Sequence, residues 1–419
     1  MTAGSNKDSP IRHFSELPPL ALYIHLPWCV KKCPYCDFNS HEAKTELPEK
    51  QYVDALLDDL ANEMPSVWGR TFSSVFIGGG TPSLFSADAI HNVLSGVRAL
   101  TGLTPNAEVT MEANPGAMEA ARFHEFKSAG VNRLSIGIQS FNDIQLQRLG
   151  RVHNAQEAHK AVEVARTAGF DNLNLDLMFG LPEQDIDAAL NDVTTALGHQ
   201  PEHLSYYELT IEPNTKFAKF PPEVPDDDVR WDMQQAANER LAEHGYSRYE
   251  VSAWSQPGQQ SHHNTNYWLF GDYVGIGAGA HGKISFANNN TVIRRWKHKH
   301  PSTWMNMRGG EKVGGEHTVA AEDTGLEFMM NALRLTKGFN LIDFTTNTGL
   351  SIQPWLGAIE KGVAAGLLDR NQGRLKATER GFELLNDVLA LFMSEPESAA
   401  SPNGGASTVS RITIPIKPA

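Results

Sequence analysis

The sequence is short of cysteine, of basic residues and of long apolar runs. It has 3 cysteines in 419 residues, and so small an odd number does not suit a disulfide framework. Acidic residues (49) outnumber basic ones (36), and a net charge of −13 argues against nucleic-acid binding through a broad basic face. No run approaches the ~18 apolar residues of a transmembrane helix, and residues 1–17 lack the apolar core of a signal peptide. We therefore expect a cytoplasmic protein with no transmembrane segment.

The three cysteines that are present fall close together, at Cys29, Cys33 and Cys36. Thiolates with this spacing can hold three corners of a cubane [4Fe–4S] cluster. The fourth iron then has no cysteine and is open to another ligand. A structural zinc site is the alternative, but zinc needs four ligands. His25 or His41 would have to complete that set, and neither lies at a usual finger spacing.

A strand followed by a helix recurs six times in the first half of the chain. Strand patterns lie at residues 22–26, 74–77, 108–112, 133–138, 172–178 and 203–209. Helical spacing lies between them, at residues 51–64, 87–100, 117–129, 142–168 and 186–198. This alternation predicts parallel βαβ units with right-handed crossovers. Because six units are fewer than the eight of a closed barrel, we predict an α/β fold with an open, partial (β/α)6 barrel of the TIM type.

Chemically capable residues gather where these predicted strands end. Besides the cysteines, they include the triple glycine at residues 78–80, Glu112, Gln139 and Asp176. In such barrels the site is built at the carboxyl ends of the strands. Glycine lets the backbone approach a ligand closely, a carboxylate accepts from an ammonium or a ribose hydroxyl, and Arg151 suits a carboxylate. Each alone is more often an ordinary polar residue, but together they predict a nucleoside site.

The second half of the chain has a different pattern. A helix is expected from Asp226 to His244, with its three leading aspartates as the cap. Strands of a second region are expected at residues 246–254 and 273–276. Helical patterns at residues 324–335, 353–365 and 379–392 surround a hairpin at 367–377. This order predicts a smaller α+β region that ends in a winged-helix-like domain, a fold that need not bind DNA.

Three segments carry a resemblance to a known family. Residues 23–29 (YIHLPWC), 36–40 (CDFNS) and 174–182 (NLDLMFGLP) resemble the HemN/HemW group of radical S-adenosylmethionine (SAM) proteins. The resemblance implies a [4Fe–4S] cluster on the three cysteines, with SAM bound to the open iron. It also implies SAM contacts from Tyr23, Phe38, Gly79, Gly80, Thr81, Glu112, Gln139, Arg151 and Asp176. Some members bind two SAM molecules, and the last of these residues would then belong to the second.

Two features place the chain within this group. The group is divided between oxygen-independent coproporphyrinogen III oxidases and heme chaperones, and Phe38 stands where the oxidases have a fourth cysteine. The segment His263–Trp268 matches the His-Asn-x-x-Tyr-Trp motif of the chaperones. The resemblance thus implies heme bound near His263, with His262 as the alternative ligand, and no oxidase turnover. Heme would pass to acceptor hemoproteins, including membrane hemoproteins through peripheral contact.

The sequence alone leaves three other functions open. They are the oxidase itself, a radical SAM methyltransferase that uses two SAM molecules, and a zinc-stabilised binding module. The segment Gly277–Gly282 matches GxGxxG, but no clear helix follows and no acid lies about 20 residues on, so we reject a dinucleotide site. We expect this segment to pack the second region against the barrel.

The patterns divide the chain into five parts. The expected boundaries give a flexible N-terminal arm (1–19), the radical SAM partial barrel (20–225), a linking region with the His-Asn-x-x-Tyr-Trp motif (226–320), the winged-helix-like domain (321–393) and a disordered tail (394–419). The tail is rich in Ser, Pro, Gly and Ala and has too little apolar surface to pack.

Overall fold

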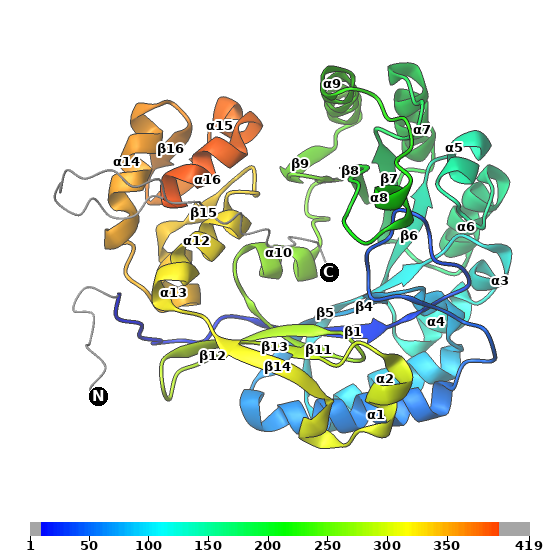
Figure 1. Cartoon of the computed structure of the whole chain (residues 1–419), viewed down its shortest axis with the longest axis horizontal. Coiled ribbons are helices and arrows are strands. Elements are labelled where there is room, and N and C mark those ends of the chain that lie inside the picture. The colour runs from blue at the N-terminus through cyan, green and yellow to red at the C-terminus, as the bar shows by residue number, and fades with distance from the viewer. Residues whose placement is uncertain (1–9, 394–419) are drawn as a thin grey trace.

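The computed structural model describes residues 10–393; the tail predicted to be disordered (394–419) and the first nine residues lie outside this range. A twelve-stranded sheet forms its centre (Figure 1). In spatial order the strands are β14 (Val313–Thr318), β13 (Thr291–Lys297), β12 (His281–Phe286), β11 (Asp272–Ile276), β1 (Leu20–Leu26), β4 (Thr71–Gly79), β5 (Gly102–Ala113), β6 (Arg133–Gln139), β7 (Leu173–Phe179), β8 (His203–Glu208), β10 (Ala253–Ser255) and β9 (Ser247–Glu250).

The middle of this sheet is parallel and its edges are antiparallel. β11, β1 and β4 to β8 pair in parallel, while β12 to β14 add antiparallel strands on one side and β10 and β9 on the other. The sheet begins at β14 and ends at β9, so it is open. The predicted α/β fold with a partial, TIM-like barrel is therefore confirmed, and all six predicted strands form.

β11 corrects one detail of this prediction. The strand was expected in a second region, but Asp272–Ile276 pairs in parallel with β1 and extends the barrel by a seventh parallel strand. The pairing joins segments about 250 residues apart, and a five-residue strand carries no local sign of such a partner. The predicted linking region is thus built into the barrel sheet.

Helices from the crossovers cover the outer face of the sheet (Figure 1). They are α1 (Glu49–Glu63), α2 (Ala87–Leu100), α3 (Ala117–Ala120), α4 (Phe123–Ala129), α5 (Asp143–Arg148), α6 (Ala155–Thr167) and α7 (Ile186–Gly198). Their buried residues recur at helical spacing, as Tyr52, Leu56 and Leu60 do on α1. Within residues 10–393, no helix combines the length and the apolar character that crossing a membrane requires.

Side-chain caps fix where several helices begin. Ser86 accepts a hydrogen bond from the amide of Ala89 at the start of α2, and Asn154 forms a capping box with Glu157 on α6. Asp226 caps α9 (Asp227–Glu243), a helix that packs on α7, by accepting from the amide of Val229 at 2.9 Å. The leading aspartates therefore act as the predicted cap.

The C-terminal part has its own apolar core. It contains α12 (Ala321–Ala332), β15 (Phe339–Asn340), α13 (Leu341–Thr348), α14 (Leu356–Ala364), the hairpin β16 (Leu368–Asn371) and β17 (Arg374–Ala377), α15 (Glu379–Glu383) and α16 (Leu385–Met393). Phe344 packs edge-to-face on Phe328 and at a tilt on Trp355 within this core. Helices around a small antiparallel sheet give the winged-helix-like arrangement that the sequence predicts.

Residues 10–19, expected as part of a flexible arm, are packed. Phe14 is buried against Val292 of β13 and Val319 after β14. The amide of His13 donates to the carbonyl of Gly349, beyond α13, at 2.6 Å. This segment therefore connects the edge of the main sheet, through Phe14, with the C-terminal helices, through the backbone of His13.

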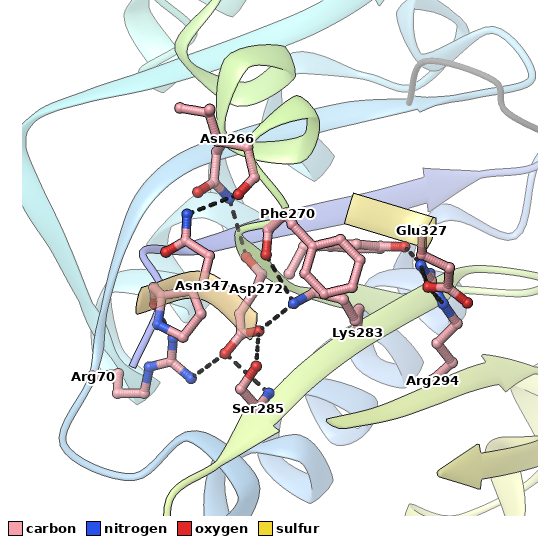
Figure 2. Close-up of polar contacts among 12 residues, drawn as sticks. Arg70, Asn266, Phe270, Asp272, Lys283, Ser285, Arg294, Glu327 and Asn347 are labelled. Carbon is pink, nitrogen blue, oxygen red and sulfur yellow. Dashed lines mark hydrogen bonds and ion pairs between the residues drawn. The ribbon is translucent and has the colours of Figure 1, made fainter. Parts of the chain in front are cut away.

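A buried ionic cluster stabilises the edge of the barrel (Figure 2). Asp272 at the start of β11 is fully buried, and its carboxylate accepts from Arg70 at 2.8 Å, from Lys283 at 2.9 Å and from Ser285. Each buried charge thus has a hydrogen-bonded partner, which offsets the cost of removing it from water.

The same cluster holds the short helix α10 (His262–Trp268) in place (Figure 2). Asn266 of α10 donates to the backbone carbonyl of Asp272 at 3.2 Å, and Asn347 of α13 donates to the carbonyl of Leu269 just after the helix at 2.8 Å. α10, which carries the His-Asn-x-x-Tyr-Trp motif, is therefore held between the barrel and the C-terminal helices.

Candidate functional site

A cavity of about 540 Å³ lies inside the barrel. Alternate residues of two strands line it, namely Arg133, Ser135, Gly137 and Gln139 of β6 and Asn174, Asp176 and Met178 of β7. Successive side chains of a strand point to opposite faces, so the residues between these pack into the outer core. Six steps at ~3.3 Å separate Arg133 from Gln139, about 20 Å along the strand. The cavity therefore extends from one end of the strands to the other.

The cysteine loop lies at the carboxyl end of this cavity. It follows β1 and includes β2 (Trp28–Cys29), which pairs with β3 (His41–Glu42). All three cysteines are free thiols and line the cavity. The amide of Cys36 donates to the carbonyl of Cys33 at 3.1 Å, which turns the loop. Burial raises the pKa of the Cys29 thiol, and a hydrogen bond with the Thr81 side chain partly offsets this shift.

Arg151 connects the cysteine loop with the barrel wall. It follows α5 and lines the cavity. Its guanidinium donates to the sulfur of Cys33 at 3.6 Å, to the side-chain oxygen of Asn114 at 2.7 Å and to the carbonyl of Gly137 at 2.9 Å. Three partners from three segments fix this cation beside the sulfur of Cys33.

The glycine segment after β4 packs directly on the cysteine loop. The amide of Gly80 donates to the carbonyl of Leu26 at 2.8 Å, and that of Thr81 donates to the carbonyl of Trp28 at 2.7 Å. A Cβ atom on Gly80 would lie 2.5 Å from the Trp28 oxygen, and one on Gly79, whose φ is +113°, would lie 2.5 Å from the ring of His25. Only glycine permits this approach.

Glu112 at the end of β5 is held against the same segment. Its Oε2 accepts from the amide of Gly79 at 2.9 Å. Burial raises the pKa of Glu112 to about 7, against the lowering effect of that hydrogen bond, and the charge of Asp176 raises it further. A buried carboxylate with no cationic partner to lower its pKa is suited to receive a positively charged group of a ligand.

Polar side chains continue from Glu112 along β6 and β7. Gln139 adopts the left-handed region at φ +66°, and its Oε1 accepts from the hydroxyl of Tyr207 at 2.7 Å. Asp176 accepts from Ser135 and from Asn174, both at 2.8 Å. Burial raises the pKa of Asp176, and these hydrogen bonds partly offset the shift. These groups offer several acceptors to a polyhydroxylated ligand.

Most predicted site residues meet in this cavity. Its wall includes Cys29, Cys33, Cys36, Phe38, Gly79, Gly80, Thr81, Glu112, Gln139, Arg151 and Asp176. Tyr23 and His263 do not line the cavity. Both pack against Phe76, which does. The ring centroids are 6.3 Å apart for Tyr23 and Phe76, and 5.1 Å apart for Phe76 and His263.

His263 is a buried residue near the amino-terminal end of the barrel. It is 2% exposed, and its Nδ1 shares a hydrogen bond of 3.0 Å with the hydroxyl of Ser74. Burial lowers the pKa of His263 to about 4, so its ring is neutral. The adjacent His262 is exposed on the first turn of α10. The motif therefore lies at the opposite end of the strands from the cysteines.

The sequence alone did not point to several residues that line the cavity. They are Arg133, Asn114, Tyr207, Glu250 and Arg334. Arg133 begins a strand in which apolar residues alternate with polar or small ones. That alternation could have indicated that Arg133 faces the inside of the barrel. Arg334 follows α12, in a part of the chain with no local link to the barrel, so only the tertiary structure brings it here.

The segment Gly277–Gly282 has the packing role that was expected. The amide of Gly277 donates to Asp59 of α1 at 3.1 Å, and the carbonyl of Ala278 accepts from Asn39 of the cysteine loop at 2.9 Å. The segment runs into the strand β12, which begins at His281, rather than into a helix. It therefore lacks the helix N-terminus on which a dinucleotide site is built.

The thiols have no histidine partner for a zinc site. His25 contacts the hydroxyl of Tyr23 at 2.9 Å and the carbonyl of Asn39 at 2.9 Å, while His41 contacts the side chain of Asn39 at 3.3 Å. In the described part of the chain, no three Cys, His, Asp or Glu side chains surround a common metal position. A cubane cluster suits three thiols on one loop, because each cysteine binds a different iron.

Comparisons with known proteins agree with this geometry. The family models that match are the radical SAM superfamily, over residues 23–193, and the HemN C-terminal domain, over residues 319–384. The heme chaperone HemW of Escherichia coli (strain K12) is 47% identical over 380 residues, covering 91% of this chain and 100% of the relative. HemW of Bacillus subtilis (strain 168) is 33% identical, covering 89% and 99%.

The solved structure of coproporphyrinogen III oxidase (HemN) from Escherichia coli has the same fold. It superposes with a TM-score of 0.76 at 21% identity and covers 90% of each chain. At that identity the likeness speaks for the fold alone, whereas the sequence relatives match over nearly their whole length. The chain therefore belongs to the HemW family of the radical SAM superfamily.

Proposed function

We propose that this protein is a cytoplasmic heme chaperone, which binds heme and transfers it to acceptor hemoproteins. The observation that carries the proposal is the 47% identity to a heme chaperone over that relative's entire length. Phe38 adds to it, because a phenylalanine cannot supply the fourth thiol that the oxidases have near this position. Peripheral contact with membrane hemoproteins is part of the same proposal.

We further propose that Cys29, Cys33 and Cys36 hold a [4Fe–4S] cluster with SAM on its open iron. The donor set fits, because three free thiols line one cavity and Arg151 lies beside them. When bound, the cluster supplies the open iron and one-electron chemistry for SAM. The protein orients the ligand and keeps water from it.

In this proposal, different elements of the barrel contact different groups of SAM. The backbone at Gly79, Gly80 and Thr81 approaches the ligand from β4, and Glu112 accepts from its ammonium group. Asp176 and Gln139 accept from ribose hydroxyls, and Arg151 donates to a carboxylate. A second SAM would use these last three residues. Tyr23 and Phe38 complete the set, Tyr23 from behind Phe76 and Phe38 from the wall.

We place the heme at the α10 end of the cavity. His263 is the ligand that the family motif implies, and to bind iron its ring must displace Phe76 or leave Ser74. His262, exposed on the same turn, is the alternative. The two are neighbours on one helix, so a matched pair of alanine variants separates them.

A transfer assay tests the proposal. The reconstituted protein is loaded with heme under anaerobic conditions and mixed with an apo-hemoprotein, and the acceptor's absorbance spectrum is followed. We expect transfer that is slowed in whichever of His262→Ala and His263→Ala removes the iron ligand, with the other variant behaving as wild type. Acceptor reconstitution at the same rate with and without the protein would contradict chaperone function.

A further inference from the structure

Arg133 is a buried arginine that borders the cavity and has two donor atoms without a partner. It is the first residue of β6 and is 2% exposed, yet it lines the cavity. Its Nε and Nη2 atoms have no hydrogen-bond partner among residues 10–393. Buried guanidinium groups are normally paired, because an unpaired buried donor is destabilising. An unpaired one that borders a cavity indicates that a ligand supplies the acceptor.

The carboxylates near Arg133 are already engaged with other donors. Glu108 accepts from the hydroxyl of Ser261 at 3.1 Å and from the amides of His262 and His263, both at 3.0 Å. Its charge lies close enough to Arg133 for the arginine to lower the pKa of Glu108. Glu108 therefore stabilises the cation electrostatically but accepts a hydrogen bond from neither of its unpartnered atoms.

Asp176, the other nearby carboxylate, is engaged in the same way. Ser135 and Asn174 donate to its two oxygens, and Arg133 acts on it only through its charge. Ser135, the next inward residue on β6, has a small side chain and lines the same cavity. A ligand inside the barrel therefore meets Arg133 at the cavity wall, and the side chain must rotate to present its buried Nε and Nη2 atoms to that ligand.

A second arginine borders the same end of the cavity. Arg334 donates to Glu250 at 3.2 Å, and its guanidinium lies 4.4 Å from the ring centroid of Trp268 on α10. Its Nε also lacks a partner in the described chain. Both arginines thus lie beside α10, although they come from parts of the chain far apart in sequence.

We propose that Arg133 forms a carboxylate-binding subsite at the α10 end of the cavity, with Arg334 at its border. The inference rests on the proposed function, which supplies a ligand with carboxylates: the propionate groups of heme. The amino-acid carboxylate of a SAM molecule is the second possible source of the same group. Arginine suits either one, because its planar fork can donate two parallel hydrogen bonds to a carboxylate.

The test titrates the reconstituted full-length protein anaerobically with heme and with heme dimethyl ester, whose propionates carry no charge. A parallel titration uses SAM. The variants are Arg133→Gln, Arg133→Lys and Arg334→Gln. The control is Arg166→Gln, which removes an arginine that pairs with Glu202 at 3.0 Å and does not line the cavity. Circular dichroism and iron content confirm that each variant folds and holds its cluster.

The expected result is that wild type binds heme roughly 10- to 100-fold more tightly than the ester, as loss of a charge-assisted hydrogen bond predicts. Arg133→Gln abolishes this preference, Arg133→Lys keeps part of it, and Arg166→Gln leaves it intact. If Arg133→Gln weakens SAM binding instead, the subsite is supported, and the carboxylate that it binds is that of SAM.

Equal affinity of wild type for heme and ester, with SAM binding unchanged in Arg133→Gln, would overturn the subsite and leave heme binding in place. Where Arg133→Gln fails to fold, Arg133→Lys, which keeps the charge but not the planar fork, supplies the variant comparison for both ligands. Wild type that binds neither heme nor ester would contradict the proposed function itself, and the SAM titration would then decide the subsite.

Discussion

The carboxylate of Glu112 accepts a hydrogen bond of 2.9 Å from the amide of Gly79. This contact joins the end of β5 to the glycine segment after β4, and that segment in turn packs on the cysteine loop. The three elements therefore form one unit at the carboxyl end of the barrel, so changes in any one of them are expected to affect cluster and SAM binding together.

The buried state of Glu112 makes stability depend on pH. Its pKa is raised from 4.5 to about 7, so the native state binds this proton more tightly than the unfolded chain does. The stabilisation is present below about pH 4.5 and is lost as pH rises through about 7. We predict that Glu112→Gln, relative to wild type, gains on the order of 3 kcal/mol of unfolding free energy across this range.

Chemical unfolding of the cluster-free protein at several pH values measures this difference. The control is Glu243→Gln, an exposed residue of α9, which should follow wild type. If Glu112→Gln and wild type keep a constant difference between their unfolding free energies over the whole range, Glu112 is not buried as a titrating group.

Gly80 is predicted to be essential for cluster binding. In Gly80→Ala the new Cβ would meet the Trp28 carbonyl at 2.5 Å, a backbone contact that cannot rotate away. The cysteine loop must then shift, and we expect most bound iron and sulfide to be lost. Gly198→Ala is the matched control, because a Cβ there meets nothing within 4 Å. Iron and sulfide analysis after reconstitution distinguishes the two; equal content would contradict the packing argument.

Arg151 is predicted to support SAM binding through its position beside Cys33. Arg151→Gln removes the donors that reach Cys33, Asn114 and the carbonyl of Gly137, so we expect SAM affinity to fall about tenfold or more. Arg148→Gln removes an arginine that pairs with Glu183 on the outside. Calorimetric SAM titration should show a loss for the first variant alone, and a similar loss in both would indicate a general charge effect.

Asp272 is predicted to be a major contributor to stability. Asp272→Asn leaves Arg70 and Lys283 without their shared anion in a buried position (Figure 2). We expect the free energy of unfolding to fall by about 3–5 kcal/mol, as for other broken buried ion pairs. Lys50→Gln, which breaks an exposed pair with Asp54, should not change it measurably. Urea unfolding of both variants tests the difference, and a small effect of Asp272→Asn would refute the role of the cluster.

Local signals were sufficient for the cysteine loop, the six strands and the glycine segment. Cys29, Cys33 and Cys36 lie close together in sequence. Glu112 and Gln139 lie at the ends of β5 and β6, whereas Asp176 lies in the middle of β7. Because parallel strands bring their carboxyl ends to one rim, position along the chain predicted that these residues meet. The cavity lining contains all of them.

Long-range pairings were beyond the sequence. The place of β11 beside β1 depends on partners about 250 residues away, and the approach of Arg334 to the barrel depends on how the C-terminal helices dock. The burial of His263 against Phe76 likewise depends on tertiary packing. The motif alone does not show whether its histidine is exposed or buried.

Anaerobic titration of the reconstituted protein with heme, followed by absorbance, tests the central claim most directly. Coproporphyrinogen turnover is assayed on the same sample. We predict saturable, stoichiometric heme binding and no turnover. Robust turnover without heme binding would contradict the chaperone function and would assign the chain to oxidase chemistry instead.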